Sequence, residues 1–429
     1  MHSLKYLLSA LAAGRLLKRA KVLFLYSYYL AIEKINPRWG LERPRFRVES
    51  DPPTPVERDR TSGIEIHLVS DHDARAEFGQ PDARRQALVT RIADKFRTAR
   101  CFTCDAALTP MIQVVNAADA ADFIEVAWCP SCDGLQYSVM PSKAWISGWY
   151  ASFWDSTGTT DEKLEERRTT YRYFHRLAPY LPKRKLRVLD IGAGYGEKIR
   201  PFAEAGHEVH CTEATTRRAE YLRQHVTPHV YFGTLDTPDV RESLRRNGPF
   251  DLIFSYHVVE HIYDARKELQ ILRDIAADNA IFHLAIPEFY KEGILNNVYA
   301  LEHVASFSRR AAKTLLAQVG FETVVAKDDL FQYYSNYCQF LIGRKARNGN
   351  AVTVERNPDP ERCARYLAEA LRLDTLAGMN GSTFSYRYNG HRKLTYRISN
   401  ESKAKCRNVG GHLPIRIYHH DLPLFWMQS

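Results

Sequence analysis

The sequence lacks long apolar runs and has few cysteines. No stretch of the 429 residues approaches the roughly 18 consecutive apolar residues that a membrane-spanning helix needs. Eight cysteines in a chain of this length are too few for the disulfide scaffold of a small secreted domain. Because 45% of the residues are hydrophobic, the chain can bury one or more large cores. We therefore expect a globular protein of several domains and not an integral membrane protein.

Acidic residues are scarce at the two ends of the sequence. Residues 1–47 hold ten Lys/Arg against two Asp/Glu, and residues 346–429 hold thirteen against seven. The net charge of +10 therefore leaves about −4 for residues 48–345. A slightly acidic middle region argues against a channel that follows a phosphate backbone, so nucleic acid is not the expected partner.

Four of the cysteines form two closely spaced pairs, "CFTC" and "CPSC", separated by 24 residues. The pairs bracket a predicted hairpin built from "MIQVV" and "FIEVAW". Two Cys-x2-Cys pairs can aim four sulfurs at one tetrahedral ion, which predicts a structural zinc in a zinc-ribbon-like domain. A thioredoxin-like redox pair is the alternative. The predicted ligands are Cys101, Cys104, Cys129 and Cys132, and thiolate ligands imply a reducing compartment, the cytoplasm.

The first 35 residues are compatible with a helix throughout. Leu4, Leu7, Leu8 and Leu11 recur at helical spacing, and a cluster of Lys/Arg follows between positions 15 and 21. A signal peptide is disfavoured because a second apolar run follows the basic cluster, where a cleavage site would be expected. Two alternatives stay open: an amphipathic helix at an anionic membrane surface, or a helix packed on the protein or on a second subunit. The oligomeric state is not defined by the sequence.

The sequence divides into four blocks. We expect a basic helical segment and linker over 1–60, a zinc-binding domain over 61–145, an α/β domain over 146–345 and an α+β extension with a small β-rich tail over 346–429. Within 146–345, strand-like and helix-like segments alternate, as in a Rossmann-like doubly wound parallel sheet. Each domain is expected to have its own core.

A glycine-rich turn, "DIGAGYG", follows the first predicted strand of the α/β domain. Its glycines, Gly192, Gly194 and Gly196, do not match the dinucleotide pattern G-x-G-x-x-G, and a Gly-Lys-Ser/Thr phosphate loop is absent. The turn and the segments after it instead resemble the class I S-adenosylmethionine-dependent methyltransferases. The resemblance covers about 200 residues and includes "FDLIFSYHVVEHIYD" after the turn.

The resemblance implies a set of cofactor contacts. The acidic residue that ends the second strand, Glu213, would accept hydrogen bonds from both ribose hydroxyls, since a carboxylate has two acceptor oxygens. The third strand would end beside the adenine. The implied cofactor-binding residues are Asp190, Gly192, Ala193, Gly194, Gly196, Glu213, Ala214, Thr234, Leu235 and Tyr256.

The acceptor is predicted less directly. The segments "AIPEFY" and "LEHVASFS" resemble methyltransferases that act on sugars and other small polar acceptors, and some sugar C-methyltransferases also have a four-cysteine zinc domain. We therefore expect a sugar, nucleotide sugar or glycan acceptor. The alternatives are an RNA or protein methyltransferase that uses the zinc ribbon and basic ends, and a non-catalytic S-adenosylmethionine-binding protein.

Candidate catalytic residues follow the fourth strand of the α/β domain. His257, Glu260 and His261 would face the acceptor, and His257 is the preferred base because imidazole titrates near neutrality. A structural role for Glu260 and His261 is the alternative, and His303 is the second candidate for the base. Three aromatic residues before the first strand would either cover the cofactor or belong to the core: Trp149, Tyr150 and Phe153.

Overall fold

The computed structural model describes twelve parts of the chain. They are residues 47–49, 64–69, 95–116, 119–144, 146–148, 170–292, 303–329, 338–346, 363, 383–388, 392–398 and 415–419. The predicted helix over 1–35 and the aromatic residues Trp149, Tyr150 and Phe153 lie outside them. Within the described parts, no helix is both long enough and apolar enough to cross a membrane.

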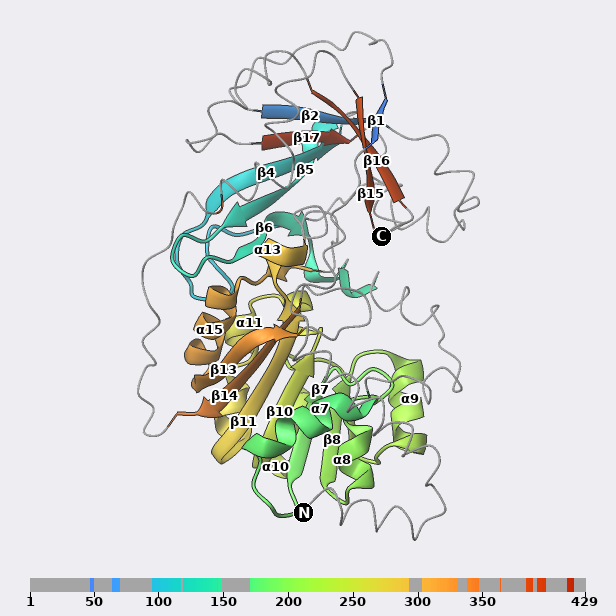
Figure 1. Cartoon of the computed structure of the whole chain (residues 1–429), viewed down its shortest axis with the longest axis vertical. Coiled ribbons are helices and arrows are strands. Elements are labelled where there is room, and N and C mark those ends of the chain that lie inside the picture. The colour runs from blue at the N-terminus through green and yellow to red at the C-terminus, as the bar shows by residue number, and fades with distance from the viewer. Residues whose placement is uncertain are drawn as a thin grey trace, which may run out of the picture.

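A seven-stranded sheet forms the lower half of the molecule (Figure 1). Five of its strands are parallel neighbours in the order β11, β10, β7, β8, β9. The strand order therefore reverses direction between β7 and β10, which is where doubly wound folds bind ligands. The five strands are β7 (Arg187–Ile191), β8 (Glu208–Glu213), β9 (Val230–Phe232), β10 (Phe250–Tyr256) and β11 (Ala276–Pro287).

The sheet is not parallel throughout, which corrects the sequence prediction. The strand β14 (Cys338–Lys345) runs antiparallel to both β11 and β13 (Phe321–Asp329). The sequence predicted a parallel sheet and not this antiparallel strand, because a short apolar run carries no information on strand direction. The edge strand β13, "FETVVAKDD", was not anticipated. The Rossmann-like doubly wound arrangement itself is confirmed by the strand order.

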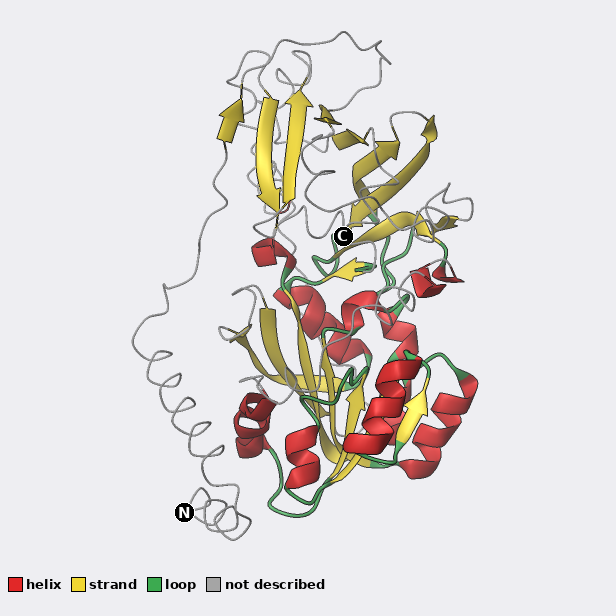
Figure 2. Ribbon diagram, turned by 90° about the vertical axis from the view of Figure 1, so that its right-hand side faces the viewer, coloured by secondary structure: helices red, strands yellow, loops and turns green. Residues whose placement is uncertain are grey.

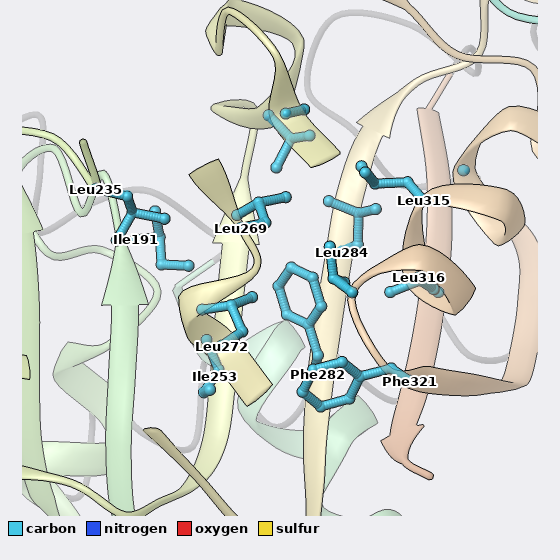
Figure 3. Close-up of a cluster of buried hydrophobic side chains, with 14 of the residues drawn as sticks. Ile191, Leu235, Ile253, Leu269, Leu272, Phe282, Leu284, Leu315, Leu316 and Phe321 are labelled. Carbon is cyan, nitrogen blue, oxygen red and sulfur yellow. The ribbon is translucent and has the colours of Figure 1, made fainter. Parts of the chain in front are cut away.

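Helices cover both faces of this sheet (Figure 2). One face carries α7 (Thr170–Leu177), α8 (Arg200–Glu204) and α9 (Thr216–His225). The other carries α10 (Pro238–Asn247), α12 (Ile271–Ile275) and α15 (Arg309–Gln318). Figure 3 shows side chains of α12 and α15 packed beside those of the strands. Shorter helical elements are η1 (Ala178–Tyr180), η2 (Val259–His261), α11 (Ala265–Glu268) and α13 (Phe289–Glu292).

Along each strand of the sheet, successive side chains pack on opposite faces. In β7, Val188 packs with α7 to α9, whereas its neighbour Leu189 belongs to the cluster on the opposite face. Alternate side chains of a strand point to opposite faces, so a strand covered on both sides must be apolar at nearly every position. This requirement explains the near-continuous hydrophobic runs that identified these strands in the sequence.

A second sheet, of ten strands, lies above the first (Figure 1). Its order is β1, β15, β16, β2, β17, β4, β5, β6, β12, and β3 pairs with β6. Strands from the N-terminal and C-terminal blocks therefore share one sheet, and β17 lies between β2 and β4. The sequence predicted the hairpin strands β4 and β5 and the strands of the small β-rich tail, but not the partners of these strands and not β1, β3, β6 or β12. The ten strands are β1 (Arg47–Glu49), β2 (Ile64–Val69), β3 (Lys95–Arg97), β4 (Thr109–Asn116), β5 (Asp119–Trp128), β6 (Leu135–Pro141), β12 (Ala305–Ser306), β15 (Thr383–Tyr388), β16 (Arg392–Ile398) and β17 (Ile415–His419).

The two sheets share part of one hydrophobic core. Cys101, Cys129 and Cys132 belong to the same buried cluster as residues of α15 and β12. The strand β12, which precedes α15 in the chain, pairs with β6 of the upper sheet. The hydroxyl of Tyr263 donates a hydrogen bond to the Pro141 carbonyl across the junction at 2.8 Å. The expectation of a separate core for each domain was therefore wrong.

Candidate functional site

The glycine turn follows β7 and has three left-handed residues, each with different surroundings. The φ angles are +68° at Gly192, +59° at Gly194 and +76° at Gly196. A Cβ at Gly192 would lie 2.6 Å from Cγ2 of Val258, and one at Gly196 would lie 2.8 Å from Leu222. A Cβ at Gly194 would meet no atom within 4 Å. Gly192 and Gly196 therefore allow close packing, whereas Gly194 borders open space in which a ligand can lie against the backbone.

Glu213, at the end of β8, is already engaged by the backbone of the turn. Its Oε2 accepts a hydrogen bond from the Gly194 amide at 2.8 Å. Its Oε1 accepts from the amide and the hydroxyl of Thr215, both at 2.9 Å. A carboxylate has about four acceptor positions, so three donors leave room for about one more. Two ribose hydroxyls would thus require one present donor to move away, which the sequence alone did not indicate.

Asp190 and Tyr256 lie beside the turn, at the ends of adjacent strands. Burial raises the pKa of Asp190 well above its usual value, and the nearby Lys198 ammonium only partly opposes this effect. The Nζ of Lys198 lies 4.4 Å from the centre of the Tyr256 ring. Ala193 is part-exposed, and its amide donates to the Thr212 carbonyl at 3.0 Å. These groups line the turn beside Gly192 with polar and aromatic contacts.

The residues predicted to contact the adenine differ in exposure. Thr234 is exposed, and its hydroxyl donates a hydrogen bond to Asp236. Leu235 is buried in the apolar cluster below, so only its backbone could contact a ligand at this site. Ala214 is part-exposed. Phe232, which is not among the predicted residues, has a side chain that is 52% exposed and is the strand partner of Glu213. An aromatic residue at the end of a predicted strand is the sequence signal that points to it.

His257 lies at the carboxyl end of β10 in a strained conformation, with φ of +54°. Non-glycine residues in the left-handed region cost free energy and concentrate at functional sites. Nδ1 of His257 lies 3.0 Å from Oε1 of Glu260. Nε2 lies 3.3 Å from Sγ of Cys338, which is fully buried at the start of β14. No spacing pattern in the sequence marks Cys338, because its proximity to His257 arises only from the pairing of β14 with β11.

The structure brings the four candidate catalytic residues together. Glu260 and His261 lie in η2, and the His303 ring is 4.8 Å from the His261 ring. Burial favours a raised pKa at Glu260, but the His257 hydrogen bond and the surrounding histidines lower the pKa to about 2. Burial lowers the pKa of His303 to about 3. At neutral pH the cluster therefore contains a Glu260 carboxylate and a neutral His303 imidazole.

The four paired cysteines form a compact thiol cluster with two similar loops. Their Sγ atoms lie within 4.8 Å of one another, with 3.6 Å between Cys101 and Cys132 and 3.5 Å between Cys104 and Cys129. In both loops, the amide four residues after the first cysteine donates back to that cysteine's carbonyl. These amides belong to Asp105 and Asp133, both at φ of +64°. The separations exceed the roughly 2.05 Å of a disulfide and are close to the about 3.8 Å expected around tetrahedral zinc.

Comparison with known proteins finds similarity in one region of the chain. A methyltransferase domain family matches residues 163–326. The tRNA 5-carboxymethoxyuridine methyltransferases of two Escherichia coli strains are 28% identical over 132 residues, which is 30% of this chain. The match spans about half of those enzymes, 49% of their length.

Two solved structures resemble less than half of this chain at low sequence identity. Magnesium protoporphyrin IX methyltransferase from Synechocystis, solved with bound S-adenosylmethionine, is 16% identical, with 47% of this chain and 97% of that chain covered and a TM-score of 0.34. A methyltransferase from Archaeoglobus fulgidus is 17% identical, with 43% and 97% covered and a TM-score of 0.35. The strand order and the glycine turn described above agree with the family match. Residues 163–326 of this chain are therefore similar to a methyltransferase domain.

Proposed function

We propose that this protein binds S-adenosylmethionine at the glycine turn and transfers its methyl group to a small polar acceptor. A sugar, a nucleotide sugar or a glycan is the acceptor we favour. The observation that carries the proposal is the open side of Gly194 next to the Glu213 carboxylate. The packing of Val258 on Gly192 brings the loop with His257 and Glu260 directly against this turn. Cofactor-binding and proton-accepting groups are thus adjacent.

Glu213 would hold the ribose of the cofactor. To accept both hydroxyls, it would release either the Gly194 amide or the Thr215 hydroxyl, which now occupy its oxygens. Phe232 offers an exposed ring next to Glu213, against which the adenine can stack. S-adenosylmethionine supplies an electrophilic methyl group on a positively charged sulfur. The chain's own contribution is to align an acceptor with that methyl group and to take up the acceptor's proton.

His257 is the proposed base. Glu260 accepts a hydrogen bond from Nδ1, which leaves Nε2 as the basic nitrogen. Nε2 now faces the Cys338 thiol, so an acceptor hydroxyl would have to replace this contact. As the acceptor oxygen bonds to the methyl carbon, the carbon–sulfur bond breaks, and the hydroxyl proton passes to Nε2. S-adenosylhomocysteine and the methylated acceptor are then the products.

The cysteine cluster would hold one structural zinc. Four sulfurs at these separations need only small movements to reach about 2.3 Å from a central ion. A four-thiolate site leaves no open coordination position, so its role is to stabilise the fold. A four-cysteine zinc domain also supports the sugar-type acceptor through the resemblance to sugar C-methyltransferases.

An RNA acceptor is the second candidate. The observation that favours it is the similarity of 132 residues to tRNA 5-carboxymethoxyuridine methyltransferases. The basic residues 1–47 and 346–429 would then contact phosphates.

Residues 1–35 also support a peripheral association with an anionic membrane, which would bring the active site to a lipid-linked acceptor.

Calorimetry with S-adenosylmethionine tests the cofactor site. Glu213→Ala should weaken binding by roughly 10- to 100-fold, about 1 to 3 kcal/mol for lost hydrogen bonds. Glu208→Ala is the matched control, since Glu208 lies at the other end of β8 and contacts Arg187 and His210. Equal affinities in the three proteins would remove Glu213 from the site.

Radiolabelled methyl transfer tests the acceptor class. Purified protein would be incubated with labelled S-adenosylmethionine and either a panel of nucleotide sugars and glycans or bulk tRNA. Label on the sugar fraction supports the favoured acceptor. Label on tRNA alone, with turnover that falls steeply as salt rises, would replace it with the second candidate.

A further inference from the structure

We propose that Glu260, His261 and His303 bind one divalent transition-metal ion at the acceptor side of the methyl-transfer site. This site is distinct from the cysteine cluster. Its role in catalysis rests on the proposed function, whereas binding of the ion does not. The ligand set consists of one carboxylate oxygen and two imidazole nitrogens.

The three side chains already converge. One ligand atom from each residue lies within 4.8 Å of the other two. An ion about 2.0 to 2.1 Å from each atom would need separations of roughly 3.0 to 3.4 Å. The ligands must therefore close by no more than about 1.8 Å, which small rotations of long side chains can supply.

Glu260 provides the second observation. Its side chain is almost completely buried, at 1% exposure, and its Oε2 has no hydrogen-bond partner. An unsatisfied oxygen on a buried carboxylate is costly, and native proteins rarely leave one without a bound ion or water. A cation between Glu260 and the two histidines would satisfy this oxygen and neutralise the buried charge.

The remaining groups around Glu260 resemble those that orient metal ligands. Oε1 of Glu260 faces Nδ1 of His257 at 3.0 Å, so a hydrogen bond fixes one end of the carboxylate. Such outer contacts commonly set the orientation of a ligating group. The backbone beside His303 is also fixed, because the Tyr137 amide donates to the Val304 carbonyl at 3.2 Å. The site is thus built from two segments that each make hydrogen bonds with other parts of the fold.

The coordinating residues determine which metal ions and which acceptors the site would bind. Two imidazoles and a carboxylate suit Mn²⁺, Fe²⁺, Co²⁺ or Zn²⁺, whereas the four thiolates favour zinc. Three protein ligands leave coordination positions open. Hydroxyl or carboxylate oxygens of a polar acceptor would fill them, which would select acceptors with two neighbouring oxygens.

Binding of Mn²⁺ to the full-length protein tests this proposal by electron paramagnetic resonance. Thiolates hold Mn²⁺ poorly, so the cysteine cluster should not contribute. We expect one Mn²⁺ per chain, with nitrogen modulation in the spin echo from coordinated imidazole. Glu260→Gln and His303→Ala should each weaken binding at least tenfold. His225→Ala, which removes an exposed histidine at the end of α9, should bind as the wild type does.

Two results would overturn the metal site. The first is wild-type protein without bound Mn²⁺ or without nitrogen modulation, which needs no variant and so does not depend on whether a variant folds. The second is equal affinity in the wild type and in Glu260→Gln, with both folded by circular dichroism. Calorimetry with S-adenosylmethionine on the same samples separates the two proposals. Cofactor binding without Mn²⁺ binding refutes the metal site alone, and Mn²⁺ binding without cofactor binding refutes the proposed function alone.

Discussion

Replacement of Gly194 by alanine should separate the two roles of the glycine turn. At φ of +59°, an alanine costs about 1 to 2 kcal/mol relative to glycine, because its Cβ crowds the neighbouring backbone. No other atom lies within 4 Å of the new Cβ, so no further cost arises in the protein without ligand. The free energy of unfolding should therefore fall by about 1 to 2 kcal/mol, which lowers Tm by roughly 2 to 8 °C.

The loss of cofactor affinity should exceed what the backbone strain can cause. The strain is present both with and without ligand, so it largely cancels from the binding free energy. The Cβ, however, projects into the open space where the cofactor would lie against the turn. We expect S-adenosylmethionine to bind at least tenfold more weakly, a loss of at least about 1.4 kcal/mol.

Gly206→Ala is the matched control for this experiment. Gly206 follows α8 with φ of +86°, and a Cβ there would also meet nothing within 4 Å. It should lower Tm by a similar amount and leave the calorimetric affinity unchanged. If Gly194→Ala binds the cofactor as tightly as Gly206→Ala, the space beside Gly194 is not the cofactor site. If both weaken binding equally, strain and not ligand contact explains the effect.

Three further predictions concern stability and location. The pKa of Glu260 is about 2, against 4.5 for a free side chain. Above pH 4.5 its ionised form therefore contributes on the order of 3 kcal/mol to the free energy of unfolding, and this contribution is lost as the pH falls toward 2. Chemical unfolding should therefore show the difference between the wild type and Glu260→Gln shrinking from pH 5 to 2, and a constant difference would contradict the assignment. Cys132→Ser should lower the Tm of the methyltransferase domain as well as the upper sheet, because Cys132 belongs to the shared core, and a calorimetric scan with an unchanged methyltransferase transition would refute this. The full-length protein should sediment with anionic liposomes at low salt, whereas a shortened chain starting at residue 48 should not, and a full-length protein left in the supernatant would exclude the membrane-surface role.

The sequence predicted the parts of the site that depend on local backbone. Gly192, Gly194 and Gly196 lie in a turn after a strand, as predicted, and all three adopt positive φ. Glu213 ends the next strand, as predicted, and lies at the same edge of the sheet, where it accepts a hydrogen bond from the Gly194 amide. The roles predicted for such residues depend on their positions along the chain, which a sequence motif specifies directly.

The features that the sequence did not reveal arise from contacts between distant segments. Cys338 meets His257 across 81 positions, through strand pairing that no motif encodes. Leu235 was expected beside the adenine, but the way its turn packs on α10 directs the side chain into the core. The shared core at Cys132 was missed for the same reason, since composition suggests where a domain lies but not what it packs against.

The position of β17 has a consequence for the order of folding. Ile415 pairs with Ile64 on one side and with Ile112 on the other, so the closing contact joins segments about 350 positions apart. The methyltransferase strands β7 to β11 lie within about 100 consecutive residues and can pair as soon as that segment has left the ribosome. The sheet above can close only after residue 419 has emerged. Until then β2 and β4 keep unpaired edges, and this interval is when the growing chain is most exposed to association with other chains.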